Sequence, residues 1–438
     1  MIELLTLATA LASALLMTRL FKKLGFNFPD VTIFLVTGLL LGPYCLGKLN
    51  IAGLGFPTME TTEQYGFIST VALGFIAFSI GNEFKLSQLK GIGKQASVIG
   101  VFQAIVAMVF VDIALVILGF LTGFKIINIP TAITLGAIAT ATAPAATLMV
   151  VKQYKAQGEL TSLLLPIVAL DDAVGIVSFA ISFGIAQAMV NSTVSVISIV
   201  VNPIIEIIAS CLMGSLMGLI LSKLEELFYS NSNRLSITIA FVFLTIAFSS
   251  LKFTFGKITV EFSSLLVCMM LGTVLCNMCE RSGDIMSRSD MWTTPLNTLF
   301  FVISGAELEL GVFRNLWFVL VGIIYVIVRS MGKYYGARAS ASFTGCSSKV
   351  TKYLGYTLLP QAGVALGMCK QAVTLSPEDG KIIKNIVLFA ILIYELAGPS
   401  ITHWALLKSG DIVERPKDKT SHDRFKTPKD YKTSKTAK

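Results

Sequence analysis

Two adjacent aspartates, Asp171 and Asp172, lie near the middle of residues 160–190, an apolar segment that carries no other charge. An ionised acid at the centre of a membrane-spanning helix costs about 2.5–3.5 kcal/mol on insertion scales, so a purely structural role for two of them is hard to justify. Neighbouring side chains on a helix project about 100° apart. One acid can therefore face a water-filled cavity while the other reaches a charged partner. The pair predicts a site that binds a cation or exchanges protons.

A partner for these acids is available in residues 315–342, where Arg329 and Lys333 stand four residues apart and hence on one helix face. A lysine can release its proton when it is desolvated, whereas an arginine stays protonated. We therefore predict that Lys333 takes part in proton coupling. Arg329 is either a fixed countercharge or an anchor to lipid headgroups at the cytoplasmic end of its helix.

Three single acids, Asp112, Glu206 and Glu395, lie in other apolar segments. Each could take a direct part in transport, or could form a structural pair with another polar group of the helix bundle. The sequence leaves both roles open, and Glu206 is a secondary site candidate together with Arg329.

The elements that position these residues are apolar segments of membrane-spanning length. Hydrophobic residues make up 54% of the 438 residues and charged residues only 14%, against roughly 25% charged residues in soluble domains. Runs of about 20 apolar residues, enough to cross a bilayer, recur along the chain. We predict an all-α polytopic membrane protein with about thirteen transmembrane helices. The predicted segments are 2–18, 31–47, 66–81, 95–121, 130–151, 160–190, 194–222, 234–251, 260–278, 292–312, 315–342, 352–374 and 381–407.

Proline and small residues interrupt two of these segments at matching positions. The fifth contains Pro144 within Thr140–Thr147, and the twelfth contains Pro360 and Gln361. Six spans, one linker span and six spans would make two halves of inverted topology, and broken helices at corresponding positions indicate a binding site near the midplane. Proline frees backbone carbonyls that must be satisfied by protein or water. We expect Gln361 to satisfy the break rather than to select the ion.

The distribution of basic residues predicts the orientation of the chain. If the N-terminus is outside and the C-terminus is cytoplasmic, most loop lysines and arginines lie on the cytoplasmic side, as the positive-inside rule requires. Residues 1–408 form the predicted membrane domain, and residues 409–438 a disordered, basic cytoplasmic tail that could contact anionic lipid headgroups. Because this tail carries much of the net charge of +9, the charge does not indicate nucleic-acid binding.

Signatures of cofactor-dependent or catalytic chemistry are weak in this sequence. There are two histidines, and the seven cysteines are scattered except for Cys276 and Cys279, which we interpret as small apolar residues. No phosphate-binding loop of the G-x-x-x-x-G-K-[ST] type occurs. We therefore expect no cofactor, no metal beyond a transported cation and no enzymatic activity, with transport driven by an ion gradient.

Several motifs carry a resemblance to a known family. Thr142-Ala-Pro144 is followed about thirty residues later by Asp171-Asp172. The further matching motifs are Gly38–Pro43, Phe300–Glu307, Gly332–Gly336 and Leu359–Gly367. Over about residues 1–405, the chain resembles the sodium/proton exchanger family of the cation:proton antiporter superfamily.

The resemblance implies a homodimer in the cell membrane, with interleaved dimerisation and core subdomains and two crossing broken helices in the core. Asp172 matches the ion-binding acid of the family, and Asp171 matches the acid that pairs with a lysine, here Lys333. Members with this combination are typically electrogenic and move more protons than cations.

The sequence departs from the family pattern at the first break, where many relatives have Thr-Asp-Pro and this chain has Ala143. Backbone carbonyls near Ala143 and the hydroxyls of Thr140 and Thr142 would have to replace that acid as oxygen ligands.

The function that we predict is antiport of a monovalent cation, Na+ or else Li+ or K+, against protons that compete for Asp172. A cation channel or a regulated K+ efflux system is the alternative, although the tail is too short for a nucleotide-binding regulatory domain. An intramembrane aspartyl protease is more remote, because its two carboxyls must converge on one water and neighbours on one helix diverge.

Overall fold

The structure is a computed structural model that describes residues 2–413 except 27, 83, 87–92, 125–126, 191–195, 252, 256–257, 261, 309 and 311–315. The side chains of residues 196–203, 253–255, 258–260, 363 and 370 are also outside the description. Nearly all of the predicted tail, residues 414–438, lies outside the described residues, so its disorder stays a prediction.

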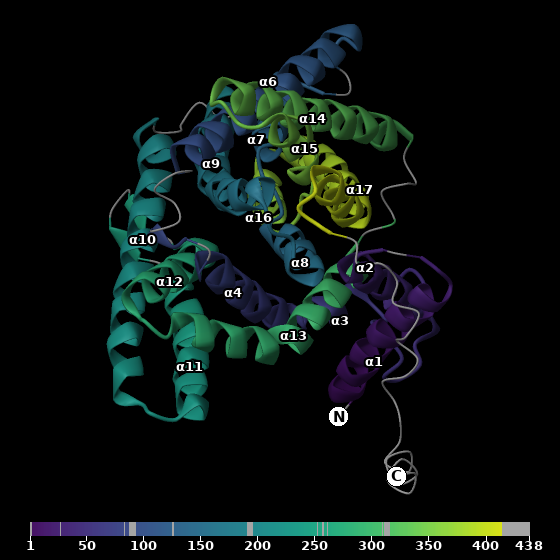
Figure 1. Cartoon of the computed structure of the whole chain (residues 1–438). Helices are drawn as coiled ribbons and strands as arrows, with labels where there is room; N and C mark the ends of the chain where they lie inside the picture. Colours follow the sequence, from purple (N-terminus) through teal and green to yellow (C-terminus); the bar gives the residue numbers. More distant parts are fainter. Residues whose placement is uncertain are drawn as a thin grey trace, which may run out of the picture.

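Helices make up nearly all of the described chain (Figure 1). A short antiparallel hairpin, which the sequence did not predict, joins the eighth and ninth apolar segments. The elements are α1 (Ile2–Lys23), α2 (Asp30–Leu41), the 3-10 turn η1 (Leu46–Leu49), α3 (Met59–Glu63), α4 (Gly66–Asn82), α6 (Gly93–Leu121), α7 (Ile129–Ile138), α8 (Pro144–Tyr154), α9 (Glu159–Val190), α10 (Val196–Leu227), α11 (Asn231–Ser249), β1 (Phe253–Phe255), β2 (Ile258–Val260), α12 (Ser264–Met278), α13 (Ser282–Ala306), α14 (Leu316–Phe343), α15 (Ser348–Thr357), α16 (Gly363–Ala372) and α17 (Pro377–Ser409).

Each predicted apolar segment coincides with a helix or with a pair of half-helices. The fifth segment forms α7 and α8, and the twelfth forms α15 and α16. Within the described residues, eight helical stretches are long and apolar enough to cross a membrane, and α4, α7 and α12 are shorter apolar helices. The all-helical membrane fold is confirmed, whereas the number of thirteen spans stays a prediction.

The helices pack in two sets that Figure 1 shows side by side. We call α6–α9 with α14–α17 the break bundle, and α1, α2, α4 and α10–α13 the flanking bundle. One hydrophobic cluster lies almost entirely inside the break bundle and another inside the flanking bundle, while a third cluster joins the two. The division into core and dimerisation subdomains stays a prediction.

Polar links between the bundles gather at the last turn of α8. The ammonium of Lys152 lies 2.6 Å from Asp290 Oδ2 of α13 and also donates to the hydroxyl of Ser79 of α4. The next residue, Gln153, accepts the backbone N–H of Asp30 at the start of α2 over 2.8 Å. The side chains of Lys152 and Asp290 are 30% and 41% exposed, so this ion pair is partly screened by solvent.

Two glycines of α14 allow that helix to approach α6 closely. A Cβ added at Gly332 would lie 2.7 Å from Ala107 Cα, and one at Gly336 would lie 2.9 Å from Gln103 Cα. Neither position has room for a side chain, as is typical of tightly packed membrane helices. Lys333 stands between the two glycines, and its ammonium contacts Asp171 of α9.

Candidate functional site

The site is built on the two helix breaks, which lie against each other inside the break bundle. Residues 139–143 separate α7 from α8, and residues 358–362 separate α15 from α16. The backbone N–H of Ala143 donates to the carbonyl oxygen of Pro360 over 2.8 Å. Pro144 occupies the first turn of α8, a position at which proline's missing N–H costs nothing. The two helix breaks, which Pro144 and Pro360 marked in the sequence, are therefore in direct contact.

Arg329 of α14 supplies the donors that the breaks lack. Its side chain is fully buried. Its Nε donates to the carbonyl of Ala139 over 2.9 Å, its Nη2 to that of Ala141 over 2.6 Å, and its Nη1 to that of Leu359 over 2.7 Å. The guanidinium also lies over the ring of Tyr394, 4.5 Å from the ring centroid. This burial rules out the headgroup anchor that the sequence left open for Arg329.

Lys333 lies one turn further along α14 and is also fully buried. Its ammonium donates to the carbonyl of Thr140 over 2.6 Å and to the hydroxyl of Thr142 over 2.9 Å. It also lies 2.9 Å from Asp171 Oδ2, and neither member of this ion pair is exposed. The structure thus brings the lysine, one of the two acids and the first break together.

Asp171 has partners for both carboxylate oxygens. Besides Lys333, the hydroxyl of Thr142 donates to Asp171 Oδ2 over 2.5 Å. The amide of Gln103, on α6, donates to Asp171 Oδ1. Gln103 was not among the site residues predicted from the sequence. The signal was an amide in the interior of the apolar segment 95–121, and sequence spacing does not show that α6 packs on α9.

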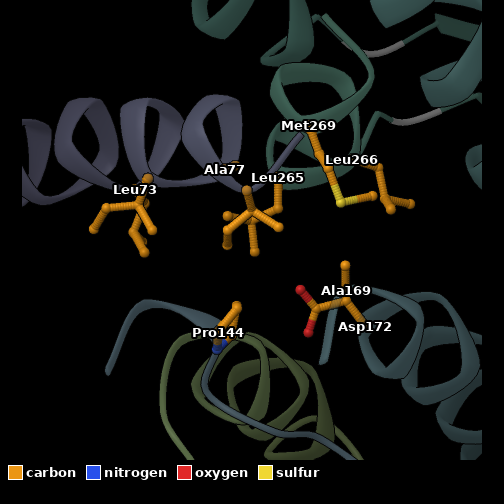
Figure 2. A pocket seen from close by; sticks show the side chains of 10 residues that line it. Leu73, Ala77, Pro144, Ala169, Asp172, Leu265, Leu266 and Met269 are labelled. Atoms are coloured by element: carbon orange, nitrogen blue, oxygen red, sulfur yellow. The ribbon is translucent and has the colours of Figure 1, made fainter. Parts of the chain in front are cut away.

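Asp172 projects away from this cluster and faces the flanking bundle. It is 6% exposed, and its Oδ1 has no hydrogen-bond partner among the described residues. Figure 2 shows its carboxylate pointing into a pocket, with side chains of α4 and α12 on the far side. The pocket, with room for about one water molecule, is lined by Leu73, Ile76, Ala77, Ile80, Pro144, Ala169, Asp172, Leu265, Leu266 and Met269.

Adjacent acids on α9 therefore have different surroundings, as the angle between neighbours on a helix predicts. Asp171 is held inside the break bundle by three side chains, whereas Asp172 lies at the boundary between the bundles among apolar walls. A buried carboxylate oxygen with no protein partner is a place where a cation, a proton or a water can bind, because an unpaired buried charge is costly.

Protein donors already occupy several of the other oxygens that we predicted as ligands. The Thr140 carbonyl binds Lys333, and the Thr140 hydroxyl donates to the carbonyl of Ala137 over 2.6 Å. The Ala143 carbonyl accepts the hydroxyl of Thr147 over 3.2 Å. The role of Thr140, Thr142 and Ala143 as cation ligands therefore stays a prediction.

Gln361 lies where the second break meets the end of α7. Its amide nitrogen donates to the carbonyl of Ile138 over 2.9 Å and to the hydroxyl of Tyr325 over 3.2 Å. The side chain thus satisfies a carbonyl at the end of a half-helix, as expected for a residue that completes the break.

The three single acids lie apart from the aspartates. Asp112 of α6 packs against Gly136 of α7, Glu206 lies half-buried on α10 in the flanking bundle, and Glu395 is buried on α17. Among the hydrogen bonds and ion pairs described for Asp171 and Asp172, none involves these three acids. Direct roles for them stay predictions.

Comparison with known proteins places the chain. A family model described as sodium/hydrogen exchanger, transmembrane, matches residues 10–408. No curated protein sequence matches the chain at a significant level.

The fold is similar to that of solved structures of the sodium proton antiporter MjNhaP1 from Methanocaldococcus jannaschii. The structure at pH 8 is 18% identical, with a TM-score of 0.68 over 95% of this chain and 100% of the other. The structure from an electron-microscopy map is 17% identical, with a TM-score of 0.70 over 94% and 98% of the two chains. At these identities the structural likeness shows the fold, and the family model carries the assignment. This multi-pass membrane protein therefore belongs to the transmembrane sodium/hydrogen exchanger family.

Proposed function

We propose that the protein exchanges a monovalent cation, most simply Na+, for protons by alternating access, with cation and proton competing for Asp172. The observation that carries the proposal is the buried, unpartnered Oδ1 of Asp172 in the pocket between the two bundles. Hard cations prefer oxygen ligands, by analogy with Mg²⁺ and Ca²⁺ sites, and a carboxylate binds either a cation or a proton. Either one neutralises the acid and lowers the cost of carrying it past apolar walls.

The position of the pocket supports alternating access. Its walls come from α8 and α9 of the break bundle and from α4 and α12 of the flanking bundle. A shift of one bundle along the other would therefore change the surroundings of Asp172 without breaking the helix crossing. In this scheme the break bundle is the mobile core and the flanking bundle contains the dimerisation surface of a homodimer in the cell membrane.

The ion pair of Asp171 and Lys333 supplies the second part of the proposed mechanism. When Lys333 releases its proton, it loses the charge that holds the Thr140 carbonyl and the Thr142 hydroxyl. These oxygens, and carbonyls near Ala143, would then be available to a cation beside Asp172. Coupling two protonatable groups to one cation would make the exchange electrogenic. The chain would lie with its N-terminus outside and its C-terminus in the cytoplasm.

The test is cation-induced proton movement in proteoliposomes that contain the purified full-length protein. Na+, Li+ and K+ are added in turn to vesicles with a pH gradient, with Asp172→Asn alongside. The matched control is Asp284→Asn, which removes an exposed acid of the flanking bundle. We expect one cation to dissipate the gradient in the wild type and the control and not in Asp172→Asn.

Folded wild-type protein that moves no protons with any of the three cations would refute the antiporter. Cation flux that continues without proton movement would favour the channel instead.

A further inference from the structure

Gln103 is a partner of Asp171 whose side chain carries both a donor and a free acceptor. Its side chain is fully buried on α6, and its amide nitrogen donates to Asp171 Oδ1 and, over 2.9 Å, to the carbonyl of Gly100. Its amide oxygen is also buried and has no hydrogen-bond partner among the described residues. The side chain thus has an unused acceptor next to a carboxyl group.

A carboxyl group that gains and loses protons needs different partners in its two states. The ionised form only accepts hydrogen bonds, whereas the protonated form must also donate one. Lys333 has only donors when it is charged, and the Thr142 hydroxyl shares its acceptor capacity with the ammonium of Lys333. The terminal torsion of glutamine is broad and roughly two-fold, so half a turn of the Gln103 amide, which gives up its hydrogen bond to the Gly100 carbonyl, would present its oxygen to a protonated Asp171.

We propose that Gln103 is a positioning residue that satisfies Asp171 in both protonation states and thereby sets the pH range of exchange. This inference rests on the proposed function and assigns Gln103 a role within it. The charged and titratable groups around Asp171 are Lys333 and Arg329 of α14 and Asp172 of its own helix. From α6, the contact with Asp171 is the neutral amide of Gln103.

The packing of α6 fixes Gln103 in this position. Gly336 of α14 lies against the Gln103 backbone, where an added Cβ would be 2.9 Å from Cα and 3.3 Å from Cβ of Gln103. Lys333, on the same face of α14, approaches Asp171 from the same closely packed pair of helices. Gln103 of α6 and Lys333 of α14 therefore contact Asp171 from two closely packed helices.

The test compares Gln103→Met, which keeps the size and removes both polar atoms, with Gln103→Glu, which keeps the shape and adds an acid. The first readout is the pH profile of cation-driven proton movement in proteoliposomes. A hydrogen bond from the Gln103 amide to an ionised carboxylate is about twice as strong as one to a neutral carboxylic acid. Gln103→Met should therefore destabilise the ionised form of Asp171 more than its protonated form. We expect the acidic limb of the profile to move to higher pH, by roughly one pH unit, with the apparent KM for the cation changed less than about threefold.

Gln103→Glu should move the limb in the same direction and further, because two neighbouring acids cannot both ionise easily. A merely structural role would instead lower the maximal rate in both variants and leave the midpoint of the profile unchanged. Unchanged midpoints in both variants, shown to be folded by size-exclusion chromatography, would overturn the inference.

A second readout does not depend on transport. Infrared titration of the detergent-solubilised protein follows the protonated carboxyl band of Asp171, identified by its loss in Asp171→Asn. A shift of the titration midpoint of this band to higher pH in Gln103→Met supports the role of Gln103, even if the wild type moves no cation. Absence of cation movement in the wild type would refute only the antiporter. A band whose midpoint is the same with and without Gln103 would refute the role of Gln103 alone.

Discussion

At the scale of single residues, Arg329 supplies the hydrogen-bond donors for backbone carbonyls at the crossing of the two broken helices. Three of its N–H groups bind three carbonyls from the two breaks, and all of these groups are buried. The planar guanidinium presents several donors in a fixed geometry, which the single ammonium of a lysine cannot reproduce. Each buried carbonyl left without a donor costs about 1–3 kcal/mol.

Arg329→Met should therefore lower the free energy of unfolding by at least about 3 kcal/mol, because several carbonyls lose their donors at once. Arg329→Lys should recover only part of the loss. Thermal unfolding of the purified protein in detergent measures both, and Arg338→Met on the exposed face of α14 serves as the control. If Arg329→Met and Arg338→Met unfolded alike, Arg329 would not stabilise the crossing.

The buried ion pair of Lys333 and Asp171 should behave differently from a surface pair. Removing one partner of a buried pair typically costs about 3–5 kcal/mol, because the other charge stays buried. We expect this cost for Lys333→Met. The double variant with Asp171→Asn should be more stable than the sum of the single effects predicts, by at least about 1 kcal/mol.

A double-mutant cycle of unfolding free energies measures this coupling. The control cycle uses Asp284 and Arg288 of α13, a pair whose side chains are 56% and 39% exposed, for which coupling of at most about 1 kcal/mol is expected. Equal coupling in the two cycles would contradict a buried charge pair at the site.

At the scale of elements, the sequence predicted the breaks better than it predicted what satisfies them. Pro144 and Pro360 marked both interruptions, and the apolar segments found most helix ends to within about five residues, although α13 begins ten residues before its predicted segment. The carbonyl contacts of Arg329 and the contact of Gln103 with Asp171 could not be predicted, because they depend on which helices pack together. That packing depends on tertiary contacts far apart in sequence, and apolar periodicity records none of them.

The contact of α6 with α14 gives a prediction at this scale. Gly336→Ala would place a Cβ 2.9 Å from Gln103 Cα and 3.0 Å from Val106 Cβ. Overpacking of this kind costs about 1–3 kcal/mol and should move Gln103 and Lys333 away from Asp171. We expect lower thermal stability and a lower rate of cation-driven proton movement.

The control for Gly336→Ala is Gly367→Ala in α16, where an added Cβ meets no atom within 4 Å. This change should leave stability equal or raise it by up to about 1 kcal/mol, because alanine favours helix more than glycine does. Equal behaviour of the two alanine variants would show that α6 and α14 do not need the close approach.

At the scale of the whole molecule, a movement of one bundle past the other must break the links of Lys152 with Asp290 and Ser79. A partly exposed ion pair contributes at most about 1 kcal/mol, so it can break in every cycle. Lys152→Gln should therefore change the exchange rate by less than about fivefold, measured as the initial rate in proteoliposomes. Lys155→Gln, an exposed lysine at the end of the same helix, is the control. Complete loss of exchange in Lys152→Gln alone would refute the view that this link opens and closes in each cycle.

The ends of α7 and α15 at the crossing have an electrostatic consequence. Aligned peptide dipoles give the C-terminus of a helix about half a negative elementary charge, and both half-helices end where their neighbouring carbonyls bind Arg329. Together these two C-termini supply about one negative charge, whereas the N-termini of α8 and α16, which begin at the same breaks, supply about one positive charge. The four dipole ends therefore cancel in sum, and Asp171 offsets only one of the two buried cations Arg329 and Lys333. With Ala143 at the first break, the crossing carries about one positive charge more than Asp171 balances.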